Sequence, residues 1–197
     1  MFYLCFKKSS LLSKATVQDK ERIEKLKDLF NTHNKKIFNL CLKMLGNQSE
    51  AEELTQDVFF KAYTSLNQFR SESNIFTWLY RIAINLCLNY QRKKRYEQWL
   101  SLDFLSESLS GKKYNSEISK DRPDLIVEKK ELEHIVQKAI NSLPRQQRIA
   151  LILRIYDGLS YQEISEITKC SISSVESRLH RAKENLAKKL IPLLKNY

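Results

Sequence analysis

The chain has 197 residues, 42% of them hydrophobic, so it can form one large or two small domains and is too apolar for wholesale disorder. Only three glycines and three prolines are present, and alternating runs of β-branched residues are missing, which excludes a strand-rich fold and predicts an all-α one. The formal net charge of +11 favours a polyanionic partner such as nucleic acid. A basic surface that serves only solubility is the alternative.

The cysteines and histidines are too widely spaced to predict a metal centre. Three of the four cysteines lie in apolar helical patterns, which indicates buried, reduced thiols of a cytoplasmic protein. No histidine stands at a metal-ligand spacing from them, so neither a metal nor a cofactor is expected. The apolar stretch 2–6 is too short for a secretory signal, and no run reaches the roughly 20 residues that would cross a membrane. We expect no membrane insertion.

A loose tail is predicted at 1–18, followed by a first helical domain over 19–95. Its first helix starts near Glu21 and ends at Gly46, because apolar residues recur at helical spacing up to that glycine. Ser49 and Glu52 then have the spacing of a capping box, which predicts that the second helix begins at Ser49.

The second helix combines acidic and aromatic residues on the side predicted to face outward. Glu53, Asp57, Phe59 and Phe60 form this group, and a surface of that kind suggests a docking partner. The alternative is that both phenylalanines turn inward and belong to the core.

A short loop over 69–74 leads to a third helix, whose buried side is predicted to run through Ile75, Leu79, Ile82, Leu86 and Tyr90. A separate polar face ends in a run of four bases at 92–95. It consists of Trp78, Arg81, Asn85, Asn89 and Arg92. Aromatic and amide groups interleaved with cations suit single-stranded or melted nucleic acid, although Trp78 alone could equally belong to the core.

Residues 96–128 lose helical periodicity and are rich in serine, which predicts a flexible linker. A second domain over 129–194 then follows, with four short helices expected. The first ends at Pro144, and the second runs from Arg145 to Tyr156 with Ile149 and Ile155 in its core.

The last two helices form a predicted helix-turn-helix over 159–186. Ser160 and Glu163 have capping-box spacing, and after a turn at Thr168 and Lys169 a second helix starts at Ser171. Its apolar stripe begins at Ile172. Its exposed face is expected to carry Ser173, Ser174, Ser177, Arg178 and Arg181. Such a helix fits a DNA major groove, whereas an ordinary helical hairpin with a solvated basic face is the alternative.

These blocks, in this order, resemble the small sigma factors of the extracytoplasmic-function group within the sigma-70 family. The matching segments are AEELTQDVFFKAY and FRSESNIFTWLYRIAINLCLNYQRKKR in the first domain, and LPRQQRIALILRIYDGLSYQEIS and SSVESRLHRAKENL in the second. Lys169 and Cys170 in the turn, and Glu176 after it, depart from the family pattern. The resemblance implies a region 2 domain of three to four helices and a four-helix region 4 domain.

The resemblance also implies a non-enzymatic subunit that brings core RNA polymerase to promoter DNA, without a small-molecule substrate and held inactive by an anti-sigma factor. Polymerase docking would fall to Glu53, Gln56, Asp57 and Phe59. Melted bases of the minus-ten element would be captured by Arg70, Asn74, Trp78, Arg81, Asn85 and Arg92. The serines and arginines of the last helix would read the minus-thirty-five duplex.

Two other classes compete with this interpretation. A two-domain regulator could have the same duplex-binding C-terminus behind a sensor domain, but the first half shows no ligand-pocket or phosphoacceptor pattern. An enzyme is disfavoured because the sequence has no glycine-rich phosphate loop, zinc-protease motif or nucleophile elbow.

Overall fold

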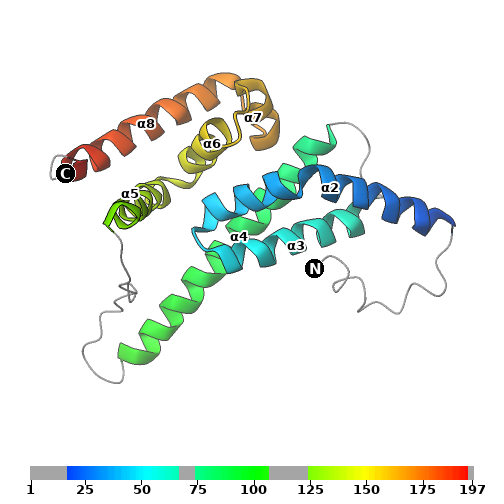
Figure 1. The fold of residues 1–197 in the computed structure, drawn as a ribbon, viewed down its shortest axis with the longest axis horizontal. Coiled ribbons are helices and arrows are strands. Elements are labelled where there is room, and N and C mark those ends of the chain that lie inside the picture. Colours follow the sequence, from blue (N-terminus) through cyan, green and yellow to red (C-terminus); the bar gives the residue numbers. More distant parts are fainter. Residues whose placement is uncertain (1–16, 67–73, 107–123, 195–197) are drawn as a thin grey trace.

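A computed structural model describes residues 17–66, 74–106 and 124–194, and every regular element in these ranges is an α-helix. The first half contains α2 (Val17–Leu45), α3 (Gln48–Ser65) and α4 (Ile75–Ser106). The second half contains α5 (Asp124–Asn141), α6 (Arg145–Ile155), α7 (Tyr161–Thr168) and α8 (Ile172–Leu194). Figure 1 shows α2, α3 and α4 packed together, with the four later helices gathered beside them. The predicted all-α fold class is confirmed. The tail at 1–16 and the loop at 67–73 lie outside the described residues.

The turn between α2 and α3 is built by Gly46 and Asn47. Gly46 has φ +75°, a left-handed conformation that glycine adopts without steric cost. The side chain of Asn47 accepts a hydrogen bond from the amide of Glu50 at 3.0 Å and so caps α3. The predicted start at Ser49 is wrong, because the asparagine directly after the glycine supplies the cap first.

Helix α4 is longer than expected and packs on two sides. No glycine or proline interrupts residues 75–106, and the ion pair between Lys93 and Glu97, at 3.8 Å and one turn apart, suits a helix. The predicted linker start at 96 therefore falls inside α4, whose C-terminal end projects beyond α2 and α3 in Figure 1. Likewise α5 begins at Asp124, ahead of the predicted 129.

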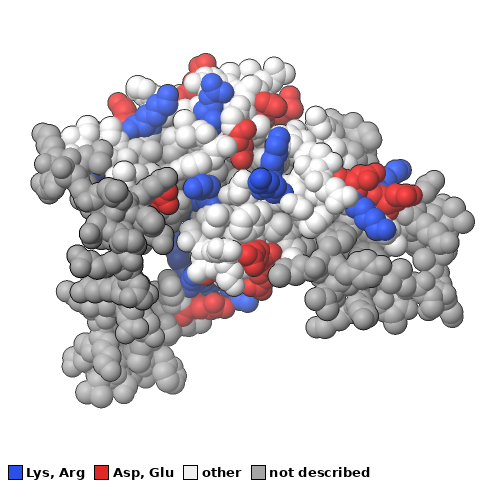
Figure 2. Space-filling model, viewed as in Figure 1, with Lys and Arg blue, Asp and Glu red and all other residues white. Residues whose placement is uncertain are grey.

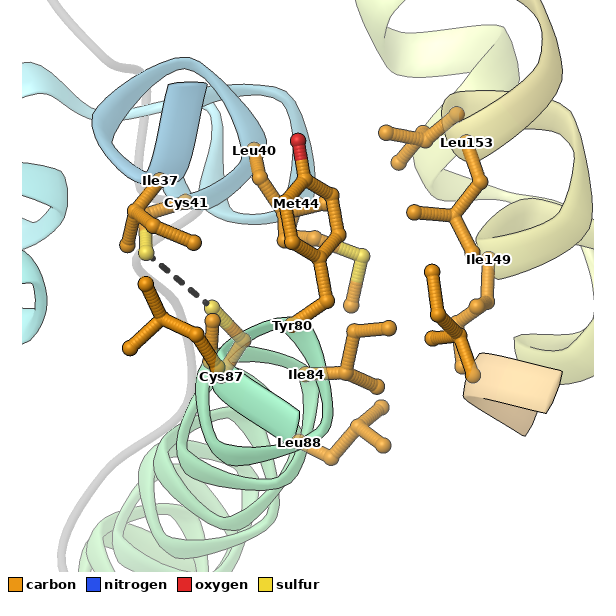
Figure 3. Packing of buried hydrophobic residues seen from close by; sticks show 14 of the residues in the cluster. Ile37, Leu40, Cys41, Met44, Tyr80, Ile84, Cys87, Leu88, Ile149 and Leu153 are labelled. Carbon is orange, nitrogen blue, oxygen red and sulfur yellow. Dashed lines mark hydrogen bonds between the residues drawn. The ribbon is translucent and has the colours of Figure 1, made fainter. Parts of the chain in front are cut away.

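The core of the first half continues into the second. Figure 3 shows Tyr80, Ile84 and Leu88 of α4 between the α2 side chains and those of α6. The fully buried positions of α4 are Leu79, Tyr80, Ala83 and Cys87. The predicted buried side is thus rotated, since Ile75, Ile82, Leu86 and Tyr90 are only half-buried. A single amphipathic stripe does not describe a helix that is covered from two directions.

Candidate nucleic-acid interface

The first helix of the predicted helix-turn-helix is α7, and it begins with a complete capping box. The amide of Glu163 donates to Oγ of Ser160 at 3.2 Å, and the amide of Ser160 donates to Oε2 of Glu163 at 2.8 Å. The hydroxyl of Ser160 also donates to Oε2 of Glu163 at 2.7 Å, and this bond, followed by the one from the Ser160 amide, lowers the pKa of Glu163. Two amide groups that a helix start leaves unpaired are satisfied, as predicted from the spacing.

The turn into α8 depends on one left-handed lysine. Lys169 has φ 51° and ψ 51°, the conformation that glycine usually supplies at such a turn. The amide of Cys170 donates to the carbonyl of Ser165 at 3.2 Å, and Oγ of Ser165 donates to the carbonyl of Cys170 at 2.6 Å. Oγ of Ser171 then accepts from the amide of Ser174 at 3.2 Å, so the predicted cap of the second helix is confirmed.

Buried Ile164, Ile167, Val175 and Leu179 hold α7 and α8 together. This packing fixes which face of α8 remains open. Ile172 is 47% exposed and does not belong to the stripe, because it lies in the first turn of α8, beyond the contact with α7. Ile155, expected in the core of α6, is likewise exposed at the end of that helix.

The open face of α8 carries the residues expected to contact duplex DNA. Ser173, Ser177 and Arg181 are exposed, and Ser174 and Arg178 are half-buried. Nη1 of Arg178 is buried and has no hydrogen-bond partner among the described residues. An unpaired buried donor of this kind is energetically costly.

The second expected face lies along α4. Asn85 and Arg92 are exposed, whereas Trp78 is half-buried against the core cluster. Asn74 is exposed and its Oδ1 accepts from the amide of Phe76 at 3.1 Å, so it also caps α4. Arg70 lies outside the described residues.

Arg81 belongs to the same face but is already engaged. Its Nη2 and Nε donate to the main-chain carbonyl of Glu166 in α7, at 2.6 Å and 3.3 Å. The structure therefore brings one expected minus-ten residue against the helix-turn-helix. Sequence reasoning could not find this contact because its partner is a backbone atom 85 residues away.

Most of the basic run at the middle of α4 is held by local contacts. Lys94 pairs with Glu50 of α3, Lys93 pairs with Glu97, and Nε of Arg95 donates to the carbonyl of Gln91. The pKa of Lys94 is raised by its hydrogen bond to Glu50. Within the described part of the chain, Arg92 is the member of the run with no hydrogen bond or ion pair.

The two adjacent phenylalanines of α3 lie in different environments, one buried and one exposed. Phe59 is 2% exposed and stacks edge-on against Phe30, with ring centroids 4.9 Å apart. Its expected place on the outer face is wrong, because that side of α3 packs on α2. Phe60 is 62% exposed, and Glu53, Gln56 and Asp57 are exposed on the same helix. The inward-facing alternative thus holds for one phenylalanine only.

Basic and acidic side chains are interspersed on the face seen in Figure 2, so the net charge of +11 does not form one continuous patch there. Among the described residues, no group of three or more histidine, cysteine or acidic side chains could hold a metal ion. The described helices include none that is long and apolar enough to span a bilayer.

Two packed helical units, the second carrying a helix-turn-helix, define a class of two-domain helical DNA-binding proteins. The sigma-70 region 2 family matches residues 29–96, and the sigma-70, region 4 family matches residues 133–186. The chain therefore belongs to the sigma-70 family of transcription initiation factors, in its extracytoplasmic-function group.

Curated relatives extend over most of the chain. It is 35% identical over 181 residues to the ECF RNA polymerase sigma factor SigW of Bacillus subtilis, covering 87% of this chain and 96% of the relative. It is 38% identical over 148 residues to the ECF RNA polymerase sigma-E factor of Escherichia coli, covering 74% of this chain and 76% of the relative.

Solved structures agree on the fold. The sigma factor RpoE of Bartonella quintana, in complex with the anti-sigma factor NepR, has a TM-score of 0.61 at 24% identity, covering 85% of this chain and 97% of that one. CnrH in complex with the cytosolic domain of CnrY has a TM-score of 0.60 at 18% identity, covering 85% of this chain and 88% of that one.

Proposed function

We propose that this chain binds core RNA polymerase and directs it to promoters with its two domains contacting different parts of the DNA. The observation that carries this function is the presence of region 2 and region 4 in one chain, each with exposed polar residues on the helix expected to meet DNA. Because both DNA-binding domains belong to one molecule, binding of one raises the effective concentration of the other at the promoter. Each domain can therefore have a low affinity for DNA by itself.

Polymerase docking is assigned to the exposed side of α3. Glu53, Gln56 and Asp57 supply polar and acidic groups, and Phe60 supplies an apolar anchor beside them. Phe59 supports this surface from the core and does not touch the partner. Partial burial, followed by the neighbouring Glu53, raises the pKa of Asp57. A basic patch on the partner would stabilise its charged form.

Duplex recognition is assigned to the first three turns of α8. Ser173, Ser174 and Ser177 offer short hydrogen-bonding groups to base edges, while Arg178 and Arg181 can contact guanine or phosphate. The test within this element is Arg178→Ala, which should cost about 1 to 3 kcal/mol if it reads a base. If Arg178 contacts a phosphate, the slope of the logarithm of the binding constant against the logarithm of the salt concentration should instead become about one unit less steep.

Capture of the melted strand is assigned to the polar face of α4 up to Arg92 and to the loop before this helix. Extruding a base costs a few kcal/mol of lost stacking, so a protein that opens DNA must offer compensating contacts. Asn85 and Arg92 are exposed, and Trp78 is half-buried against the core. Arg70, Asn74 and Arg81 complete the proposed set.

No residue of this chain is assigned a chemical step, and no cofactor is needed. A partner of bacterial RNA polymerase works in the cytoplasm, which is where we place this protein. The two solved relatives are bound to an anti-sigma factor and to a cytosolic domain, so we infer that this chain also has an anti-sigma partner.

The test is reconstitution with core RNA polymerase. The full chain should co-elute with core polymerase, and the complex should start transcripts at a discrete set of sites on sheared genomic DNA from the same organism. Asn85→Ala should lower permanganate reactivity of thymines at those sites while leaving co-elution intact. Co-elution without new start sites would contradict the proposal, as would duplex binding by the chain with no affinity for polymerase.

A further inference from the structure

The Arg81 fork caps the C-terminal end of α7. In an eight-residue helix the last carbonyl groups have no partner within the helix, and they carry its partial negative charge. The amides of Lys169 and Cys170 both donate hydrogen bonds to the carbonyl of Ser165. The carbonyl of Glu166 therefore accepts no main-chain hydrogen bond from this turn. Arg81 donates two hydrogen bonds to this carbonyl. The contact thus satisfies an unpaired group of the helix-turn-helix with a cation from the other half of the chain.

A second set of polar contacts joins the two halves at the opposite end of their interface. Nη2 of Arg148 donates to Oε1 of Gln91 at 2.5 Å. Nε2 of Gln137 donates to the carbonyl of Lys43 at 3.0 Å. The ammonium of Lys43 also lies 4.5 Å from the ring centroid of Tyr156. These bonds tie α2 and α4 to α5 and α6.

Gly46 marks how closely the halves approach. A Cβ at this position would lie 3.3 Å from the side-chain nitrogen of Asn141 and 3.6 Å from Cγ of Gln137. Between the two polar sets, Ile149 and Leu153 face Tyr80, Ile84 and Leu88 (Figure 3). The interface therefore has an apolar centre with hydrogen bonds at both ends, and relative motion is common for two domains that meet within one chain.

We propose that this packing is an autoinhibited state in which Arg81 acts as a latch, and that the same guanidinium must leave Glu166 before it can contact a melted base. This inference rests on the proposed function of the α4 face. We name the packed form, defined by the Arg81–Glu166, Arg148–Gln91 and Gln137–Lys43 bonds, the closed arrangement. Domain closure and base capture then exclude one another because they compete for one side chain.

The competition has a consequence for affinity. A ligand that binds only the open form has its apparent affinity reduced by the fraction of molecules that are open. If closure leaves about one molecule in ten open, a variant that cannot close should bind single-stranded minus-ten DNA about tenfold more tightly. The open face of α8 is outside this competition, because Ser173, Ser177 and Arg181 are exposed in the closed arrangement.

The experiment compares three variants of the free full-length chain by small-angle X-ray scattering and by binding to a fluorescent single-stranded oligonucleotide of the promoter. Gln91→Ala with Gln137→Ala weakens closure without touching an assigned DNA residue. Arg81→Ala removes both the hydrogen bonds to Glu166 and the proposed contact with the melted strand. Arg92→Ala is the matched control for compactness, because it removes an exposed arginine of the same helix face that has no hydrogen bond or ion pair among the described residues. Circular dichroism checks folding, and Arg81→Lys, which keeps the charge but loses the fork, replaces Arg81→Ala if that variant unfolds.

The double glutamine variant should have a larger radius of gyration and bind the oligonucleotide about tenfold more tightly. Arg81→Ala should expand but bind less tightly than the double variant, and Arg92→Ala should stay as compact as the wild type. An Arg81→Ala chain as compact as the wild type would overturn the latch. So would expansion of the double variant with unchanged oligonucleotide affinity. Absence of oligonucleotide binding by every variant would instead count against the proposed function of α4, while the scattering would still report on the latch.

Discussion

The thiol of Cys87 donates a hydrogen bond to Sγ of Cys41 across the core, with 3.7 Å between the sulfur atoms. The pair joins α2 to α4, and Figure 3 shows both side chains between the two helices. This hydrogen bond lowers the pKa of Cys41 and, together with burial, raises that of Cys87. Both side chains are fully buried, whereas Cys170 is half-buried.

We therefore expect native-state alkylation to distinguish the cysteines. Iodoacetamide in native buffer should label Cys170 while Cys41 and Cys87 stay protected, because a buried thiol reacts only when the structure opens. Peptide mass mapping gives the rate at each site. In denaturing urea all three should react at similar rates. Labelling of Cys87 at the rate of Cys170 in native buffer would contradict the described core.

Because Lys169 has a left-handed backbone conformation, we expect that replacing it with glycine stabilises the turn. A left-handed non-glycine residue costs about 1–2 kcal/mol, and glycine removes this strain but loses more backbone entropy on folding. Lys169→Gly should therefore raise the free energy of unfolding by up to about 1 kcal/mol. Urea denaturation gives the value.

Two controls test whether the left-handed backbone causes that gain. Lys169→Ala should bring none, since alanine has the same strain. Gly158→Ala should destabilise the chain, because Gly158 has φ +69° and its Cβ would meet no atom within 4 Å, which leaves backbone strain as the cause. A gain from Lys169→Ala equal to that from Lys169→Gly would exclude the strain explanation.

The sequence predicts most elements whose signals are local, although the cap of α3 is Asn47 instead of the predicted Ser49. The capping box at Ser160, the cap at Ser171 and the glycine at Gly46 all act within a few residues, and each is present in the structure. Positions decided by contacts far along the chain were missed. The buried side of α4 is rotated because α6 covers it from a second direction, and the hydrogen bond of Arg81 depends on a backbone atom of α7.

Asp157 predicts how stability depends on pH. Burial raises its pKa to about 6 from 3.8, although the positive charge of Lys36 acts against burial. Because the folded pKa lies above the unfolded value, this contribution to the free energy of unfolding is fully present below pH 3.8. It is lost as the pH rises through about 6.

Asp157→Asn should therefore stabilise the chain at pH 7.5 by about 1 to 3 kcal/mol and change little near pH 4. Urea denaturation of both proteins at the two pH values measures this difference. His33 acts in the opposite direction, since burial and then Lys36 lower its pKa, but it is common to both proteins and cancels in the comparison. An equal effect of the substitution at both pH values would show that Asp157 matters for packing instead of charge.

Adjacent residues Phe59 and Phe60 allow core packing and polymerase docking to be separated. Phe59→Ala should lower the free energy of unfolding by about 3 to 5 kcal/mol, because it removes a buried ring that packs on Phe30. Phe60→Ala should leave it within about 0.5 kcal/mol of the wild-type value, since this ring is 62% exposed, and should weaken association with core polymerase about tenfold or more. Urea denaturation and surface plasmon resonance against immobilised core polymerase measure the two effects, with exposed Tyr96→Ala on α4 as the aromatic control. Wild-type polymerase affinity in Phe60→Ala would remove this ring from the docking surface.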